Sequence, residues 1–163
     1  SGAGVTSGAC FDAGTYDLSE SGPAGYSASA WVCTGITQDD SDTITLGLGQ
    51  SATCTITNDD IAPTLKIVKT IVNDNGGSVT DENAFGLRID GAPVLHNAVT
   101  AVSAGNHTVS EDGLPGYAAG PWGGDCNPDG SITLALGQDA ACTVTNDDVI
   151  LEEVIFSSGF ESE

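Results

Sequence analysis

Two stretches of this 163-residue chain carry nearly the same sequence. Residues 14–60 contain GTYDLSESGPAGYSASAW and, further on, DTITLGLGQSATCTITNDD; residues 105–148 contain GNHTVSEDGLPGYAAGPW and GSITLALGQDAACTVTNDD. Such a repeat is the sequence signature of tandem copies of one supersecondary unit. We therefore expect two tandem domains, residues 1–61 and 62–148, followed by a tail, residues 149–163.

The second copy opens with a segment that the first copy lacks. Residues 64–104 begin TLKIVKTIVNDNGG and precede the shared region of copy two, whereas only residues 1–13 precede that region in copy one. The first domain is therefore expected to be incomplete at its N-terminus. It would act as an acceptor for strands that it cannot supply itself.

The composition favours an extracellular protein without anionic partners. A net charge of −20 argues against binding nucleic acid or anionic membranes, since both need a basic face. No apolar run approaches the roughly 18 residues of a membrane span, so no membrane insertion is expected. Five cysteines favour an oxidising compartment, and the absence of an initiator Met fits a processed product. We expect a secreted, extracellular or cell-surface location.

Short β-branched or alternating runs, separated by turn residues, predict an all-β protein. No apolar stripe of helical period is present, and many short strands at regular spacing are typical of Ig-like β-sandwiches. Residues 73–77 (NDNGG) suit a hairpin turn, and residues 58–64 suit a linker between the domains. The expected strands are Leu65–Val72, Phe85–Ile89, His107–Ser110, Ile132–Leu136 and Cys142–Thr145 in copy two, and Tyr16–Leu18, Thr43–Leu48 and Thr53–Thr57 in copy one.

Four of the five cysteines occupy equivalent positions in the two copies. Repeat equivalence predicts one disulfide in each domain, Cys33 with Cys54 and Cys126 with Cys142, and each would contribute roughly 3 kcal/mol. Cys10 is left over, either as a free or capped thiol or as a bridge between neighbouring subunits. No CxxC pattern is present, and only His96 and His107 could assist, so no metal centre is expected from these residues.

Residues 16–26, YDLSESGPAGY, resemble the Y-x-L-x-E-x-x-x-P-x-G-Y motif of Cna-B-type stalk domains in Gram-positive pili and adhesins. The opening LKIVKTIVNDNGG and the endings CTITNDD and CTVTNDD are similar to tandem prealbumin-like repeats of bacterial surface proteins. This resemblance implies two tandem prealbumin-like sandwiches. It also implies an isopeptide bond between a first-strand lysine and a last-strand asparagine, assisted by the glutamate of the motif.

Carried over by position, the isopeptide residues of copy two are Lys69, Glu111 and Asn146, with Lys66 as the runner-up lysine. Burial would deprotonate the amine and keep the glutamate protonated, which makes the lysine a nucleophile. The alternative is that the two lysines face opposite sides of a strand and that one is simply solvated. His107 and Val109 depart from the Tyr and Leu of the motif. Copy one keeps Glu20 and Asn58, but residues 1–61 contain no lysine.

Clusters of acidic residues punctuate the loops and domain ends. Their carboxylates suit calcium, and the candidates are Asp59, Asp60, Asp147 and Asp148. No run matches an EF-hand, and solvated turn residues are the alternative interpretation. No other cofactor is expected.

The tail is apolar enough to form one more strand. Its candidate donor residues are Val149, Ile150, Leu151, Val154, Ile155 and Phe156. An exposed apolar strand is a hazard unless it is paired, and the incomplete first domain of another subunit offers a place for it. Two alternatives are that the tail folds back on its own chain or acts in export.

These observations predict a structural subunit of an extracellular bacterial filament or pilus. Copies of the chain would polymerise head to tail by donor-strand complementation. Because the donor and the acceptor lie at opposite ends of each copy, successive contacts would build an open filament. The alternative is a stalk or adhesin module that grips a host or matrix glycan through Tyr26, Trp31, Tyr117 and Trp122, which would otherwise be core residues. No GxSxG or HExxH pattern is present, so no enzyme is expected.

Overall fold

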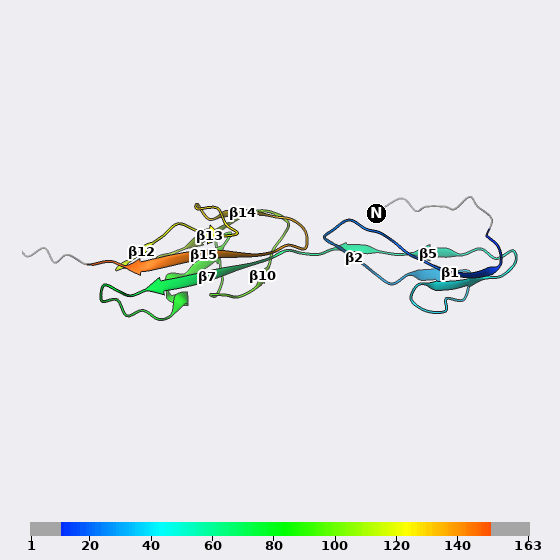
Figure 1. Cartoon of the computed structure of the whole chain (residues 1–163), viewed down its shortest axis with the longest axis horizontal. Helices are drawn as coiled ribbons and strands as arrows, with labels where there is room; N and C mark the ends of the chain where they lie inside the picture. Colours follow the sequence, from blue (N-terminus) through cyan, green and yellow to red (C-terminus); the bar gives the residue numbers. More distant parts are fainter. Residues whose placement is uncertain (1–10, 151–163) are drawn as a thin grey trace, which may run out of the picture. The chain divides into compact units, whose positions relative to one another are not determined.

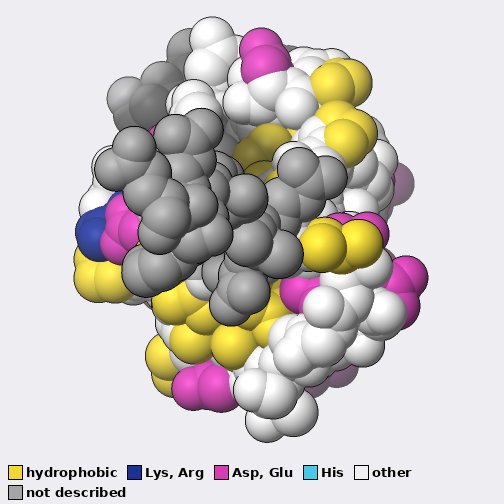
Figure 2. Space-filling view, turned by 90° about the vertical axis from the view of Figure 1, so that its left-hand side faces the viewer, with side chains coloured by type: hydrophobic (Ala, Val, Ile, Leu, Met, Phe, Trp, Pro, Cys, Tyr) yellow, Lys and Arg dark blue, Asp and Glu magenta, His cyan; other side chains and the backbone are white. Residues whose placement is uncertain are grey.

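The computed structural model describes residues 11–150 and divides the chain into two compact units. Unit one is Ser1–Ile61 and unit two is Ala62–Glu163 (Figure 1). The described residues form β-strands and one short 3-10 helix, η1 (Glu82–Phe85), so the all-β prediction is confirmed. None of their helices is long and apolar enough to cross a membrane. In Figure 2, acidic side chains are scattered over the visible face, and basic ones are confined to one place at its edge.

Unit two is built from two sheets. Its larger, five-stranded sheet has the order β10-β7-β15-β12, and β13 also pairs with β15. Its smaller sheet has the order β14-β11-β8-β9. The strands are β7 (Thr64–Val72), β8 (Leu87–Ile89), β9 (Ala92–Pro93), β10 (Thr100–Ala101), β11 (Gly105–Glu111), β12 (Tyr117–Ala119), β13 (Gly123–Gly124), β14 (Ser131–Leu134) and β15 (Asp139–Asp148).

The first and last strands of unit two lie side by side at the centre of the larger sheet (Figure 1). β7 and β15 are parallel, with a register that runs from Thr64 opposite Asp139 to Val72 opposite Asp147. Residues of β7 alternate between the two faces, as the period of a strand requires, so that Leu65, Ile67 and Lys69 point into the core. The core cluster of unit two contains Leu65, Ile67, Leu87, Ile89, Val109, Cys126, Ile132, Leu134, Ala140 and Cys142.

Unit one repeats only part of this architecture. Its strands form three separate two-stranded ladders, β1-β4, β2-β6 and β3-β5, which are the counterparts of β11-β14, β12-β15 and β13-β15. Residues 11–61 contain no counterpart of β7 to β10, and their one buried hydrophobic side chain is Ile44. The strands are β1 (Gly14–Asp17), β2 (Tyr26–Ala28), β3 (Val32–Thr34), β4 (Thr43–Leu46), β5 (Thr53–Thr55) and β6 (Asn58–Asp60).

Residues 11–61 contain no parallel partner for their closing strands, and the same sequence folds differently in the two units. In unit two the closing CTVTNDD segment belongs to one ten-residue strand, β15, which β7 accompanies along its length. In unit one the equivalent CTITNDD segment is divided between β5 and β6. The predicted strand Thr53–Thr57 therefore ends early, at Thr55.

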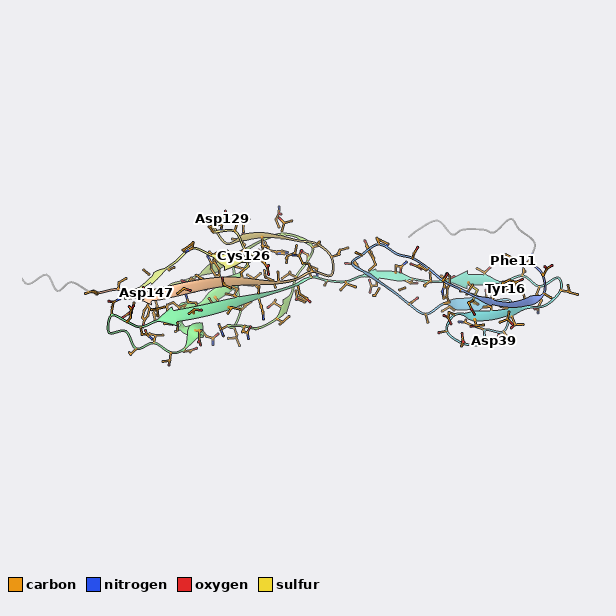
Figure 3. All side chains as sticks on the ribbon, in the orientation of Figure 1. Phe11, Tyr16, Asp39, Cys126, Asp129 and Asp147 are labelled. Atoms are coloured by element: carbon orange, nitrogen blue, oxygen red, sulfur yellow. A yellow bond between two sulfur atoms is a disulfide. The ribbon has the colours of Figure 1, made fainter. Side chains whose placement is uncertain are left out.

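Both predicted disulfides are present. Cys33 bonds to Cys54 across the β3-β5 ladder, where the two residues lie directly opposite each other. Cys126, in the loop after β13, bonds to Cys142 of β15 (Figure 3). Cys10 lies outside the described residues.

Three local predictions were wrong. The linker of residues 58–64 is shorter than expected, because Asn58–Asp60 is strand β6 and Thr64 begins β7. Phe85 belongs to η1 instead of a strand, because Asp81 caps this helix by accepting the N–H of Asn83, and Gly86 ends it in the left-handed region. The NDNGG segment makes no hairpin, because the next strand, β8, pairs with β9 and β11 in the other sheet instead of with β7.

The NDNGG loop instead wraps around the carboxylate of Asp148. The backbone N–H groups of Asp74, Asn75 and Gly77 donate to its two oxygens at 2.6–3.0 Å. Burial opposes the charge, but these N–H bonds outweigh it and hold the pKa of Asp148 below its usual value. Gly77 must be glycine, since an added Cβ would lie 2.5 Å from the Tyr117 hydroxyl and 2.7 Å from Asp148 Cβ.

Replacing Asp148 tests whether this loop depends on its carboxylate. We expect Asp148→Asn to lower the melting temperature by several degrees, since an amide NH₂ cannot accept the loop N–H groups and leaves donors unpaired. Asp147→Asn is the matched control, because Asp147 carries the same charge on the neighbouring exposed position (Figure 3). Thermal unfolding followed by circular dichroism measures both. Equal melting temperatures for the two variants would contradict the role of the loop contacts.

Candidate functional site

Lys69 is a buried cation in the core of unit two. Lys69 as a whole is 3% exposed, and its Nζ lies 4.3 Å from the centroid of the Phe85 ring. Burial lowers the pKa of Lys69, because removal from water disfavours the ammonium form, although the hydrogen bond to Glu111 partly opposes this effect. Lys66, the runner-up, falls on the other face of β7 and is half-buried. The structure therefore separates the two lysines by the alternation of the strand.

Glu111 joins Lys69 to Asn146. The Nζ of Lys69 donates to Glu111 Oε2 at 2.7 Å, and the Nδ2 of Asn146 donates to Glu111 Oε1 at 2.6 Å. The Lys69 and Glu111 side chains are 0% and 7% exposed, and Asn146 is 1% exposed. The three residues predicted from the family resemblance thus lie together in one dry cluster.

The strand register explains why these side chains meet. Lys69 pairs with Val144 in the parallel β7-β15 ladder, and Asn146 follows two positions later on the same face of β15. Glu111 is the last residue of β11 in the facing sheet, opposite Leu87 of β8. First strand, last strand and opposing sheet each contribute one group.

The amide oxygen of Asn146 is buried without a hydrogen-bond partner. An unpaired buried acceptor costs about 1–3 kcal/mol, so it requires an explanation. A protonated Glu111 could donate to this oxygen after the amide turns over, and would then polarise the amide carbon. The cluster therefore holds a buried amine, an acid–base group and an amide carbon, which are the parts of an acyl transfer.

Unit one keeps two of these three groups. Asn58 Nδ2 donates to Glu20 Oε1 at 2.5 Å, as Asn146 does to Glu111. Both residues are exposed, whereas Asn146 is buried. Residues 1–61 contain no lysine.

His107 replaces the tyrosine of the Cna-B motif and makes a different contact. Its Nδ1 lies 2.6 Å from Asp90 Oδ2, and its Nε2 lies 2.7 Å from the backbone oxygen of Ser103. Both partners are acceptors, so both ring nitrogens must donate and the ring is an imidazolium. The hydrogen bond to Asp90, followed by that to Ser103, raises the pKa of His107, and the same bond lowers the pKa of Asp90.

Of the four calcium candidates, two lie in an acidic cluster and two do not. Asp147 and Asp148 lie with Asp74, and one carboxylate oxygen of each falls within 4.8 Å of the others. Asp148 already uses both oxygens to accept backbone N–H groups. Asp59 and Asp60 are exposed on β6, and no acidic cluster of the described residues includes them. His96 accepts the N–H of Lys69 through its Nδ1.

Two of the four aromatic residues predicted for glycan contact, Tyr117 and Trp122, make contacts within unit two. The Tyr117 ring packs edge-on against Phe85 at 5.4 Å, and its hydroxyl donates to Asn73 and accepts the N–H of Val79. Trp122 packs against the core cluster. Their counterparts in unit one differ in exposure, because Tyr26 is 43% exposed whereas Trp31 is half-buried.

Only the start of the predicted donor strand falls within the described residues. The N–H of Val149 donates to the oxygen of Gly116 at 2.9 Å and so extends the β12-β15 pairing by one residue. Val149 and Ile150 are 42% and 71% exposed. Leu151, Val154, Ile155 and Phe156 lie outside the described residues.

A model of the prealbumin-like fold domain family matches residues 1–56 and residues 60–144. The protein belongs to this family. One match falls on each repeat, which confirms the predicted prealbumin-like fold for both copies. Comparison with curated proteins and with solved structures gives no significant match.

Sequence reasoning missed the loop around Asp148, although the repeat carries a signal for it. Tyr117 and Asp148 face each other across β12-β15, as Tyr26 and Asp60 do across β2-β6. A tyrosine and an aspartate that recur together in a prealbumin-like repeat indicate a shared partner. In unit two that partner is the NDNGG loop, which belongs to the segment that precedes the repeated region.

The His107–Asp90 pair predicts a pH dependence of stability. Because the folded-state pKa of His107 is raised, its contribution is complete below the unfolded value of about 6.5 and is lost as pH rises through the folded pKa. The melting temperatures of the wild type and His107→Gln should therefore differ most at mildly acidic pH and converge at alkaline pH. A difference that is independent of pH would show that His107 is not charged in the folded state.

Proposed function

We propose that the protein is a structural module of an extracellular bacterial filament or pilus, and that a covalent lock forms within unit two. The observation that carries this proposal is the buried Lys69–Glu111–Asn146 cluster. It connects the first strand of the unit to the last. A site that joins the two ends of a domain suits a protein that bears tension.

The strand arrangement explains what a lock would do under load. The chain enters unit two at β7 and leaves it at β15, and the two strands are parallel neighbours. Force on the two chain ends therefore shears their ladder of hydrogen bonds. A covalent bond between Lys69 and Asn146 would carry that force from strand to strand, and the rest of the sandwich would stay folded.

The lock forms by acyl transfer within the cluster. Lys69 gives a proton to Glu111 across the 2.7 Å contact and becomes a neutral amine. Its nitrogen attacks the amide carbon of Asn146; a C–N bond to lysine forms and the C–N bond to the amide nitrogen breaks. Glu111 gives that proton to the leaving nitrogen, which departs as ammonia, and takes the second proton from the lysine nitrogen, so that Glu111 ends protonated. The products are a neutral amide and ammonia, with no oxidant or cofactor required.

We propose that assembly uses the open first unit. Unit one contains few buried apolar side chains among residues 11–61 and lacks the counterparts of β7 to β10 in that range. A strand donated by another copy would complete it through main-chain hydrogen bonds and apolar contacts. The tail beginning at Val149 is the proposed donor. Donation of Leu65–Val72 would instead expose Leu65 and Ile67, which are completely buried in unit two.

Location and partners follow from the same proposal. The disulfides and the net charge of −20 support a secreted or cell-surface protein whose partners are copies of itself. Its chemistry is confined to its own cross-links, and it catalyses no reaction on a substrate. A glycan-binding stalk is the second candidate, because Tyr26 of unit one is 43% exposed.

Intact-mass spectrometry tests the lock. We expect the mass of the chain to be lower by one ammonia molecule than the mass calculated for its sequence with two disulfides. We expect Lys69→Arg, Glu111→Ala and Asn146→Ala to lose this difference. Lys66→Arg is the matched control and should keep it, because Lys66 lies on the other face of β7. The lock should contribute roughly 4 kcal/mol by closing a long loop. A full sequence mass for the folded wild type would refute the lock.

Electron microscopy tests the assembly. Filaments are expected from the full chain and none from a chain that ends at Asp148, because the shortened chain has no strand to donate. Circular dichroism of both proteins shows whether the truncation leaves the fold intact. Monodisperse particles from both would refute strand donation by the tail and favour the glycan-binding stalk.

A further inference from the structure

Asn75 and Gly76 form the one Asn-Gly pair in the chain. In such a pair the backbone nitrogen of the glycine can attack the side-chain amide carbon of the asparagine. The two groups are neighbours in one chain, and no Cβ on the glycine crowds their approach. The pair lies in the NDNGG loop between β7 and η1, and neither the proposed lock nor the proposed assembly uses it.

The nitrogen of Gly76 is free of competing bonds. Gly76 is the one residue at loop positions 74–77 whose N–H does not donate to Asp148, because the other three N–H groups do. Among residues 11–150 the N–H of Gly76 has no acceptor. Its φ of 98° is one that glycine adopts readily, and no atom beyond its chain neighbours lies within 4 Å of the place of a Cβ. The nitrogen is therefore open to water.

The side-chain amide of Asn75 ties the loop to the end of β15. Its Nδ2 donates to Asp74 Oδ1 at 2.6 Å and to the backbone oxygen of Asp148 at 3.0 Å. A carboxylate and a backbone oxygen both accept, so an NH₂ group fits between them and an oxygen does not. An oxygen in place of this NH₂ would remove both hydrogen bonds and bring a new negative charge close to the carboxylates of Asp74 and Asp148.

We propose that Asn75 is a site of spontaneous deamidation, and that the aspartate or isoaspartate formed there releases the NDNGG loop from Asp148. The co-reactant is water, and no cofactor takes part. The inference is independent of the lock and of the assembly, because it involves neither the Lys69 cluster nor unit one.

The reaction balances in two steps. The nitrogen of Gly76 loses its proton to the solvent and attacks the side-chain carbon of Asn75. A C–N bond forms, the C–N bond to the amide nitrogen breaks, and ammonia leaves with a proton from water. Water then adds to one carbonyl carbon of the resulting succinimide ring and breaks its bond to the nitrogen of Gly76, which regains a proton. Opening at the side-chain carbon gives aspartate, and opening at the backbone carbon gives isoaspartate. Overall one ammonia is lost and one water is gained.

The seated loop and the reaction oppose each other. Asn75 must give up its two hydrogen bonds before its amide carbon can turn to Gly76, so the reaction proceeds when the loop opens. Residues 73–76 are exposed, and exposed loops open at a low cost in free energy. The products then disfavour closing. Aspartate repels the acceptors that held the amide, and isoaspartate lengthens the backbone and displaces Gly77, whose N–H donates to Asp148 at 2.6 Å.

Peptide mapping of the full chain after incubation at mildly alkaline pH tests the site. We expect Asn75 to be converted to aspartate and isoaspartate before any other asparagine. Asp148→Asn should convert several-fold faster because it unseats the loop, and Asp147→Asn is the matched control whose rate should equal that of the wild type. Circular dichroism checks that each variant is folded during the incubation. An Asn75 that survives while other asparagines convert, or equal rates in folded Asp148→Asn and wild type, would overturn the inference.

Two further variants test the consequence for the loop. Asn75→Asp reproduces the aspartate product and should lower the melting temperature by several degrees. Ser78→Asp is the matched control, because it adds the same charge at an exposed position just after the N–H groups that bind Asp148. It should leave the melting temperature close to that of the wild type. Equal melting temperatures for the two variants would refute release of the loop.

Mass and mapping separate this modification from the proposed lock. The lock subtracts one ammonia, whereas complete deamidation replaces one ammonia by one water. The succinimide also subtracts one ammonia, but mapping places it at Asn75 and Gly76, and Lys69→Arg should still form it. A loss of ammonia that maps to Lys69 and Asn146 supports the lock alone. Conversion of Asn75 in a chain without that cross-link supports deamidation and refutes the lock.

Discussion

The parallel pairing of β7 with β15 is the contact on which the rest of unit two depends. It places Lys69 and Asn146 on the same face of neighbouring strands, where Glu111 reaches both. It keeps β15 continuous over ten residues. It also delivers the NDNGG loop to Asp148 at the end of the ladder. Unit one shows the same sequence motifs without this strand among residues 11–61, and there the ladders separate and the equivalent side chains are exposed.

The buried cluster also poses an electrostatic problem that the proposed lock would solve. Removing a lysine and a glutamate from water costs several kcal/mol for each ion, and their attraction offsets this only partly. The unpaired oxygen of Asn146 adds to the cost. An amide bond between Lys69 and Asn146 removes the positive charge and leaves Glu111 free to be neutral. The desolvation cost of the unreacted cluster would therefore favour formation of the proposed amide bond between Lys69 and Asn146.

Much of this structure could be predicted from the sequence because its two repeats can be aligned with each other. Repeat equivalence paired the four cysteines, and the family resemblance selected Lys69 over Lys66. Two of the three errors, those at the NDNGG segment and at Asn58–Asp60, have a common origin in contacts between distant residues. NDNGG has the composition of a hairpin turn, but its N–H groups bind an aspartate more than 70 positions later in the chain. Asn58–Asp60 has the composition of a linker, but it pairs with β2. Local turn chemistry contains no information about either partner.

Charge adds a final constraint on what unit one accepts. Residues 1–61 contain no Lys or Arg, and Glu20, Asp59 and Asp60 are exposed on unit one. The tail carries Glu152, Glu153, Glu161 and Glu163 and is repelled. Apolar burial and main-chain hydrogen bonds would have to overcome that repulsion for the tail to complete unit one. Because salt screens the repulsion between like charges, association of the tail with unit one should quicken as salt is added.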